Sequence, residues 1–229
     1  MKILFCGDTH GDFNNIAKLI DFAVINNCSS IMIVGDFGYF PNFGDNFLER
    51  VSFYSNLKNI DTHFIKGNHE NHDELSKYKE ITEIANNVFY HPNLTTWIVD
   101  NVSFFSIGGA YSIDKAYRTP GYNWFAGEEI GIKEIYECPK IKVDVVLSHD
   151  CPISVDINDM LRYNMDKSTK ENREKLQAIV DIVNPKLVIH GHYHMSFIRN
   201  GSSFKNISLG CNFNSIEEQT FIYDTKTGI

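Results

Sequence analysis

The sequence has no paired cysteines. Its five cysteines are odd in number and widely spaced, and none stands in a Cys-x-x-Cys pair. A disulfide framework uses an even set and a zinc ribbon uses closely spaced pairs, so neither is expected. The cysteines are expected to be buried free thiols in the reducing environment of the cytoplasm.

Long apolar runs are also missing. The N-terminal run at residues 1–6 is too short for the core of a signal peptide. No other run approaches the roughly 18 apolar residues that a membrane-spanning helix needs. We therefore expect a soluble, cytoplasmic protein without a membrane partner.

Basic residues do not outnumber acidic ones. Lys and Arg total 21 against 29 Asp and Glu, which gives a formal net charge of -8. Long-range attraction to a nucleic-acid backbone is therefore weak, and we do not expect extended nucleic acid as a partner.

Internal repeats, low-complexity tracts and Pro/Gly-rich linkers are absent as well. A chain of 229 residues, of which 43% are hydrophobic, can bury a sizeable core. We therefore expect one domain over residues 1–229.

Short runs of branched and bulky apolar residues predict strands that are buried on both faces. These runs are Ile3–Cys6, Ile31–Val34, His63–Ile65, Val143–Leu147 and Leu187–Ile189. Helical spacing of apolar residues predicts helices over Phe13–Ala23 and Leu176–Val183. Strands that alternate with helices indicate an α/β fold, in which ligands bind at the carboxyl ends of the strands.

Other strand-like runs in the second half have no helices between them. They are Thr95–Val99, Val102–Ile107, Phe197–Ile198, Ser203–Leu209 and Thr220–Tyr223. Asp100-Asn101 and Asn200-Gly201 are predicted hairpin turns, the second of type I′. These runs favour a mixed pair of sheets flanked by helices. The segment Gly108–Cys138 is the expected long functional loop.

Polar blocks follow the first set of strand-like runs. The five blocks are Gly7-Asp8-Thr9-His10-Gly11, Gly35-Asp36, Gly67-Asn68-His69-Glu70, Ser148-His149-Asp150 and Gly191-His192-Tyr193-His194. They supply carboxylates, imidazoles and one amide, which are the ligands of a pair of divalent metal ions. One block alone is weak evidence, because a lone His-x-His is more often a surface turn. Five in order are hard to produce by chance.

A pair of cations needs a carboxylate that bridges them. Asp36 stands alone after its strand, and we assign the bridge to it. Asp8 and His10 are two residues apart and can reach one ion. His192 and His194 have the same spacing and can divide between the two ions.

The third and fourth blocks add further donors. Asn68 offers a carbonyl oxygen and His149 another imidazole. A hydroxide that bridges two such ions can attack phosphorus, since a bound dication lowers the pKa of its water to roughly 7. His69 can protonate the leaving group or hold a phosphate oxygen. Glu70 is expected to orient the His69 imidazole.

The ordered pattern Asp-x-His, Gly-Asp, Gly-Asn-His-Asp/Glu, His and Gly-His-x-His resembles that of the calcineurin-like metallophosphoesterase superfamily. It spans Asp8 to His194 with every position filled. The resemblance implies a four-layer αββα sandwich of two mixed β-sheets. It also implies one metal held by Asp8, His10, Asp36 and His194, another held by Asp36, Asn68, His149 and His192, and His69 as the catalytic histidine.

One departure from the superfamily concerns the phosphate clamp. Its protein serine/threonine phosphatases extend the second block to Gly-Asp-x-x-Asp-Arg-Gly, whereas this chain continues Phe37-Gly38-Tyr39-Phe40. A basic side chain that replaces this arginine is predicted in the loop that begins at Gly108. Arg118 is favoured over Lys115, because a guanidinium binds phosphate through two donors. The predicted substrate-binding residues are Arg118, Asn68 and His69, and the predicted catalytic residues are His69 and Asp36.

The leading hypothesis is a binuclear phosphoesterase that hydrolyses a phosphomonoester or a small, nucleotide-like phosphodiester. The two ions are expected to be Mn²⁺, with Fe²⁺/Fe³⁺ or Zn²⁺ as alternatives, because all accept mixed oxygen and nitrogen ligands. A DNA or RNA nuclease is disfavoured by the excess of acidic over basic residues. A protein phosphatase is disfavoured by the missing arginine after Asp36. A non-catalytic interaction module is disfavoured because no ligand of the pattern is lost.

Overall fold

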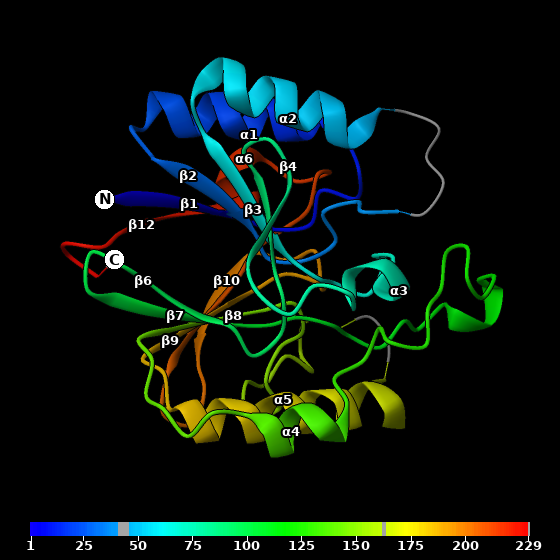
Figure 1. Ribbon diagram of the computed structural model, residues 1–229. Helices are drawn as coiled ribbons and strands as arrows, with labels where there is room; N and C mark the ends of the chain where they lie inside the picture. Colours follow the sequence, from blue (N-terminus) through cyan, green and yellow to red (C-terminus); the bar gives the residue numbers. More distant parts are fainter. Residues whose placement is uncertain (41–45, 162–163, 229) are drawn as a thin grey trace.

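The computed structural model describes residues 1–40, 46–161 and 164–228. Two six-stranded sheets face each other, and helices cover both outer faces (Figure 1). This architecture is a four-layer αββα sandwich, and the expected α/β fold class is confirmed.

The first sheet contains the N-terminal strands and the last strand. It consists of β1 (Lys2–Cys6), β2 (Ser30–Ile33), β3 (Asp61–Ile65), β4 (Thr82–Ala85), β5 (Val88–His91) and β12 (Thr220–Asp224). The strand order is β12-β1-β2-β3-β5-β4. Strands β1, β2, β3 and β5 are parallel, and each edge strand is antiparallel to its neighbour.

The second sheet repeats this plan. It consists of β6 (Thr96–Val99), β7 (Val102–Ile107), β8 (Val145–Ser148), β9 (Leu187–His190), β10 (Phe197–Asn200) and β11 (Lys205–Ser208). The strand order is β10-β11-β9-β8-β7-β6. The four inner strands are parallel and both edge strands are antiparallel, so the predicted mixed pair of sheets is confirmed.

The longer helices form the outer layers (Figure 1). Helices α1 (Phe13–Ile25) and α2 (Phe47–Lys58) cover the first sheet, and α4 (Ile132–Glu137) and α5 (Lys167–Val183) cover the second. The short helices α3 (His72–Leu75), α6 (Ile216–Gln219) and η1 (Lys115–Tyr117) lie in connecting segments.

Helix α5 is longer than its apolar pattern predicted. It begins where the Asp166 carboxylate accepts the N–H of Thr169 at 2.7 Å, as an N-cap does. The buried residues of its first turns are Thr169, Asn172 and Arg173, which are polar. A search for an apolar stripe therefore finds only the second half. The helix ends at Asn184 with φ 43°, directly before Pro185.

Strand β1 shows why the apolar runs are continuous. Leu4 and Cys6 belong to the core beneath α1 and α2, whereas Ile3 and Phe5 belong to the core between the two sheets. A third core lies between the second sheet and α5. The apolar runs of β1, β2, β8 and β9 are buried on both faces, as predicted, whereas His63 of β3 is half-buried.

The two predicted hairpin turns have different outcomes. Asp100 and Asn101 join β6 to β7 and have φ values of 48° and 68°, which is a type I′ arrangement. The type I′ prediction for Asn200-Gly201 is wrong. Strand β11 begins only at Lys205, and the Gly201 N–H donates to the Phe204 carbonyl at 2.9 Å, which closes a longer loop.

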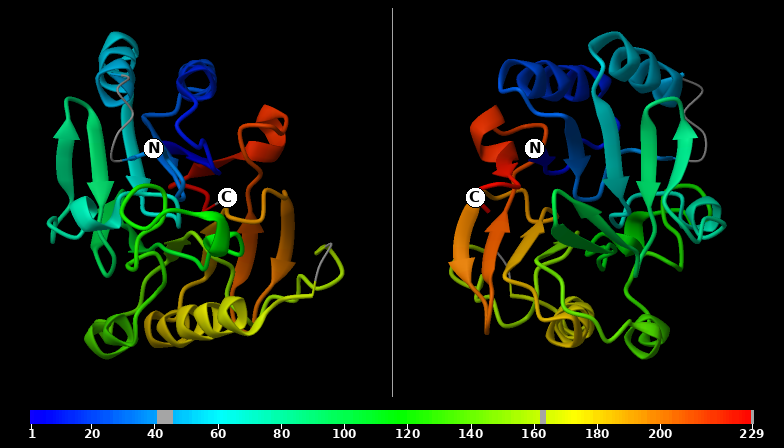
Figure 2. Two further views of the ribbon diagram at one scale, coloured as in Figure 1. Left: turned by 90° about the vertical axis from the view of Figure 1, so that its right-hand side faces the viewer. Right: turned by 60° about the vertical axis from the view of Figure 1, so that its left-hand side comes forward.

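The carboxyl ends of the parallel strands of both sheets lie on the right-hand side in Figure 1, away from the two termini. The left panel of Figure 2 turns this side toward the viewer. Side chains that follow different strands can therefore meet at one edge of the sandwich.

All five cysteines are buried and free, so the prediction of unpaired thiols is confirmed. Within residues 1–40, 46–161 and 164–228, no helix is long and apolar enough to cross a membrane.

A histidine pair between β3 and β5 predicts acid sensitivity. His63 Nδ1 lies 3.0 Å from His91 Nε2, and burial lowers the pKa of His63 to about 4 and that of His91 to about 3. The unfolded chain takes up these protons below about pH 6.5, but the folded state does not until about pH 4. Stability is therefore expected to fall between these values, by about 1.4 kcal/mol per pH unit for each histidine.

Urea unfolding at several pH values between 7 and 4 tests this expectation. The variant His91→Leu should lose stability at pH 7, because it breaks the ring contact with Trp97, whose centroid is 4.3 Å away. Its free energy of unfolding should nevertheless depend less steeply on pH than that of the wild type. Equal slopes in the two proteins would contradict the prediction.

Candidate metal centre

The structure brings the five polar blocks to one edge of the sandwich. Each follows a strand: β1, β2 and β3 in the first sheet, and β8 and β9 in the second. The side chains predicted to bind metal are Asp8, His10, Asp36, Asn68, His149, His192 and His194.

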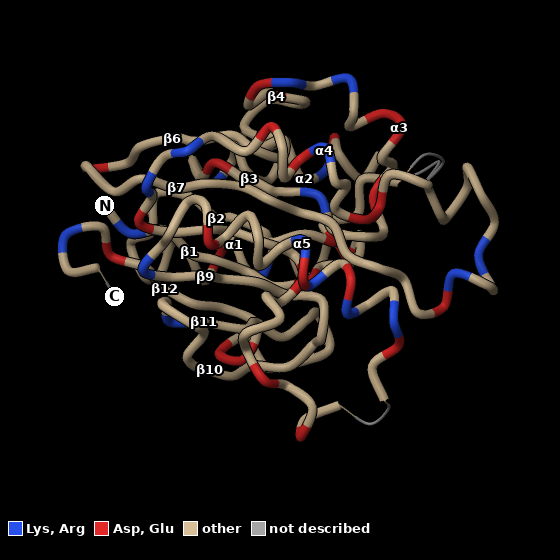
Figure 3. Tube along the Cα trace, turned by 90° about the horizontal axis from the view of Figure 1, so that it is seen from below, with Lys and Arg blue, Asp and Glu red and all other residues tan. Residues whose placement is uncertain are grey.

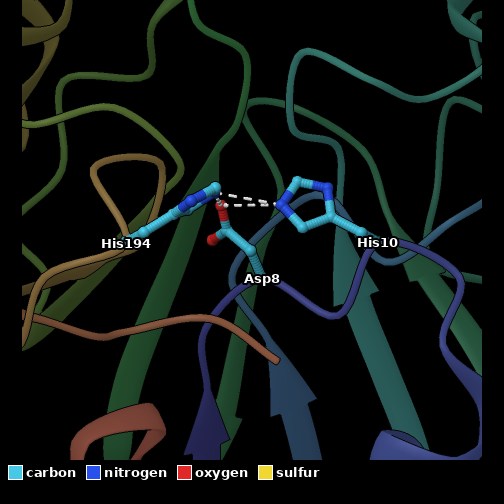
Figure 4. Close-up of side chains that lie close together, drawn as sticks. All are labelled: Asp8, His10 and His194. Carbon is cyan, nitrogen blue, oxygen red and sulfur yellow. Dashed lines mark hydrogen bonds and ion pairs between the residues drawn. The ribbon is translucent and has the colours of Figure 1, made fainter. Parts of the chain in front are cut away.

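Asp8, His10 and His194 form one group of donor atoms (Figure 4). His194 Nε2 lies 3.1 Å from Asp8 Oδ2 and 3.0 Å from His10 Nε2. Asp8 is completely buried, whereas the His194 side chain is 43% exposed. The three side chains thus present their donor atoms to a common point that is open to solvent on one side.

Asp36, Asn68 and His149 form the second half of the site. His149 Nε2 lies 3.4 Å from Asp36 Oδ2 and 2.9 Å from Asn68 Oδ1. His149 Nδ1 lies 2.9 Å from the Val34 carbonyl oxygen, to which it can donate. That bond fixes the ring and leaves Nε2 to face the site, as the outer hydrogen bond of a metal-binding histidine does.

Asp36 lies between the two halves. Its Oδ2 atom is 3.8 Å from His10 Nδ1 and 3.4 Å from His149 Nε2, and Asp36 joins Asp8 and His149 in a further group of donor atoms. A carboxylate in this position can bridge two cations. The bridging role of Asp36 stays a prediction with which these distances agree.

His192 lies at the margin of these groups. In the described part of the chain, the groups whose donor atoms lie within 4.8 Å of one another do not include it. Its ring centroid is 5.0 Å from that of His149, and its backbone N–H donates to both oxygens of Asp8 at 3.1 and 3.2 Å. The predicted ligand role of His192 stays a prediction.

The backbone of the site is strained. His10, Asp36, His192 and His194 have φ values of 47°, 52°, 70° and 55°, in the left-handed region that residues with a Cβ atom rarely adopt. Such conformations persist where the surrounding structure imposes them, and they cluster at functional sites.

Two glycines of the blocks provide space for neighbouring donors. A Cβ atom at Gly67 would overlap the Asp36 carboxylate, and one at Gly191 would overlap the Asp8 carboxylate. Each glycine therefore leaves room for a predicted ligand of another block, which is close to it in space but not in the sequence.

Buried carboxylates dominate the electrostatics. Burial by itself would lower the pKa of His149, but Asp36 and Asp8 outweigh it and raise that pKa to about 10. Hydrogen bonding to Asp8 raises the pKa of His194 to about 10. The site thus favours positive charge at its centre, and its oxygen and nitrogen donors fit a pair of divalent cations.

His69 and Arg118 are in contact beside this centre. Arg118 Nη2 lies 2.8 Å from His69 Nε2, and since a guanidinium only donates, Nε2 is the acceptor and the imidazole is neutral. Burial lowers the pKa of His69, in agreement with a neutral ring. The Arg118 side chain is only 7% exposed, and its Nη1 atom has no hydrogen-bond partner in the described ranges.

The role expected for Glu70 differs from the one observed. Its Oε2 atom accepts the backbone N–H groups of Asp36 and Gly67, and its Oε1 atom accepts that of Gly38 at 3.0 Å. Glu70 therefore ties together the loops that follow β2 and β3, instead of orienting His69. This role could not be predicted from residue types, because the partners of Glu70 are backbone amides.

Two residues of the site lie in the long loop and were not found from the sequence. The Asn68 side-chain amide donates to Ser112 Oγ at 2.9 Å, and Ser112 Oγ donates to Glu128 Oε2 at 2.6 Å. This chain of bonds holds Asn68 with its carbonyl oxygen toward His149. The only sequence signal is indirect: a ligand amide needs an acceptor for its N–H groups.

A cleft of about 570 Å³ opens above the donors, and its lining includes Asp36, Asn68, His69, Arg118 and His194. Its size is within the range of small-molecule sites. Four of the predicted ligands, Asp36, Asn68, His192 and His194, therefore face one common space together with His69 and Arg118.

Two mixed sheets with carboxylate and imidazole donors at their carboxyl edge have the arrangement of a metal-dependent hydrolase. A model of the calcineurin-like phosphoesterases matches residues 1–196, and the chain belongs to this family. The matched region contains every predicted site residue.

Solved structures share the fold. The protein TT1561 of Thermus thermophilus is similar with a TM-score of 0.58 at 12% identity, over 92% of this chain and 89% of that one. A dimetal phosphatase from Danio rerio gives a TM-score of 0.55 at 10% identity, over 93% of this chain and 88% of that one. At these identities the likeness shows the fold alone. The search of curated proteins finds no match.

Proposed function

We propose that this chain hydrolyses a phosphomonoester or a small, nucleotide-like phosphodiester with the help of two divalent metal ions. The observation that carries the proposal is the cleft that Arg118 and His69 line together with four candidate metal donors, Asp36, Asn68, His192 and His194. Manganese is the expected metal, since it accepts mixed oxygen and nitrogen donors.

When bound, the two cations would supply Lewis acidity and an activated water molecule. Asp8, His10 and His194 would hold one of them, and Asn68, His149 and His192 the other, with Asp36 shared. The chain of bonds from Asn68 through Ser112 to Glu128 keeps the amide oxygen turned toward His149.

Arg118 is proposed to bind the phosphate group. Its Nη1 donor is buried and unpartnered in the described ranges, and the side chain lines the cleft. A phosphate oxygen would satisfy this donor, and the planar guanidinium can bind two oxygens at once. This role compensates for the arginine that is missing after Asp36.

His69 is proposed to assist the leaving group. Its Nε2 atom now accepts from Arg118 Nη2. When a phosphate oxygen takes that donor, Nε2 is free to take up a proton from solvent and to pass it to the leaving oxygen as the P–O bond breaks.

The substrate is proposed to be small, and the protein cytoplasmic. Among the residues that Figure 3 draws in colour, Lys and Arg are scattered among Asp and Glu along the trace and form no continuous basic track. The five free thiols agree with a reducing compartment.

Turnover by purified protein tests the proposed function. With added Mn²⁺, the wild type is expected to release nitrophenol from nitrophenyl phosphate esters, and a chelator should abolish the activity until metal is restored. No turnover of any phosphoric ester with manganese, iron or zinc would contradict the proposal.

The variant His69→Ala tests the leaving-group role. Its kcat should fall by about 10²- to 10⁴-fold. The loss should be larger for phenyl phosphate than for nitrophenyl phosphate, because the more basic phenol needs a proton more. Equal losses for the two esters would show that His69 binds the phosphate without protonating the leaving group.

A further inference from the structure

Apart from the predicted metal ligands and His69, the positive and negative side chains that line the cleft are equal in number. Among the described lining residues, the remaining charged side chains are those of Arg118 and Asp114. Arg118 Nη2 lies 2.7 Å from Asp114 Oδ1, so the positive charge of the guanidinium is paired with a carboxylate at the same opening.

Apolar side chains line the same space. They are Ile113, Met160, Leu161 and Met195, which come from the long loop, the segment before α5 and the turn after β9. Ile113 is 55% exposed. An exposed apolar side chain at the mouth of a polar site provides a surface for an apolar part of the ligand.

These two features suit one class of ester better than the other. A phosphomonoester presents two negative charges and terminal oxygens that need several donors. A phosphodiester presents one negative charge and a second, uncharged ester group. A neutral Arg118–Asp114 pair next to an apolar wall matches the second case, because Asp114 repels the additional charge of a monoester.

We propose that the cleft selects phosphodiesters over phosphomonoesters, with Asp114 as the residue that disfavours the dianion and the apolar wall as the seat of the second ester group. This inference rests on the proposed function and specifies its substrate class.

Asp114 has a second possible role that the experiment must separate. It precedes η1 and pairs with Arg118 four residues later, so it can simply hold the arginine in place. A carboxylate that only holds Arg118 would affect both classes of ester alike. A carboxylate that selects would affect the doubly charged monoester more than the singly charged diester.

The experiment compares 4-nitrophenyl phosphate with bis(4-nitrophenyl) phosphate in the presence of Mn²⁺, since both release the same leaving group. The wild type should show the higher kcat/KM for the diester. The variant Asp114→Asn should raise the monoester-to-diester ratio of kcat/KM by about tenfold. It should also be inhibited by inorganic phosphate at a lower concentration than the wild type.

Two further variants complete the test. Glu137→Gln removes one negative charge from an exposed position on α4, where the side chain is 57% exposed, and should leave the ratio unchanged. Met160→Gln keeps the side-chain length but makes the wall polar. It should lower kcat/KM by about fivefold for the diester, with little change for the monoester.

Three outcomes would overturn the inference. A wild type with the higher kcat/KM for the monoester would overturn the inference and leave the proposed function in place. Equal losses for both esters in Asp114→Asn would show that Asp114 only positions Arg118. Absence of turnover with either ester would contradict the proposed function and this inference with it.

Discussion

Replacing Asp36 with asparagine is expected to lower kcat/KM by at least about a thousandfold, because a bridging carboxylate contributes several kcal/mol to the binding of both ions. The change should leave the fold intact. An asparagine Oδ1 can still accept the His69 backbone N–H, which lies 3.0 Å from Asp36 Oδ1. Steady-state kinetics and elemental analysis of bound metal measure the effect.

The matched control is Asp21→Asn. Asp21 lies on the outer helix α1, pairs with Lys58 at 2.6 Å and belongs to none of the groups of donor atoms in the described part of the chain. It undergoes the same chemical change and should keep wild-type activity and metal content. Activity of Asp36→Asn within tenfold of the wild type would show that Asp36 does not bridge the ions.

Removing the Glu70 side chain is expected to have the largest effect on stability. The variant Glu70→Ala leaves three buried backbone N–H groups without their acceptor, those of Asp36, Gly38 and Gly67. Each such loss costs about 1–3 kcal/mol, so we expect the free energy of unfolding to fall by about 4 kcal/mol or more. Urea unfolding measures the change.

Two comparisons test the cause. Glu70→Gln keeps one acceptor oxygen and should be intermediate in stability. Glu74→Ala removes an exposed carboxylate of α3 that pairs with Lys77, and should change stability by less than about 1 kcal/mol. A Glu70→Ala protein as stable as the wild type would refute the cross-loop role.

Local patterns predicted most of the inner framework. Strands buried on both faces leave continuous apolar runs, and these runs identified β1, β2, β3, β8 and β9 to within a few residues. Helix α2 was not predicted, because it has no apolar stripe: Val51 and Ser55 are its buried residues, whereas Phe53 and Leu57 are exposed.

The sequence by itself determined which donors this protein has and in which order they follow the strands. That order identified the family, because residue type and position along the chain suffice to recognise the ligand pattern. Oxygen and nitrogen donors specify a site for divalent cations wherever they are brought together.

Only the tertiary structure decided which of these groups meet. It places His194 within 3.1 Å of Asp8, and Arg118 against His69 and Asp114. It also gave Glu70 a role across two loops. The physical reason is that these contacts depend on the packing of two sheets and on the path of an aperiodic loop, and neither leaves a periodic signal in the sequence.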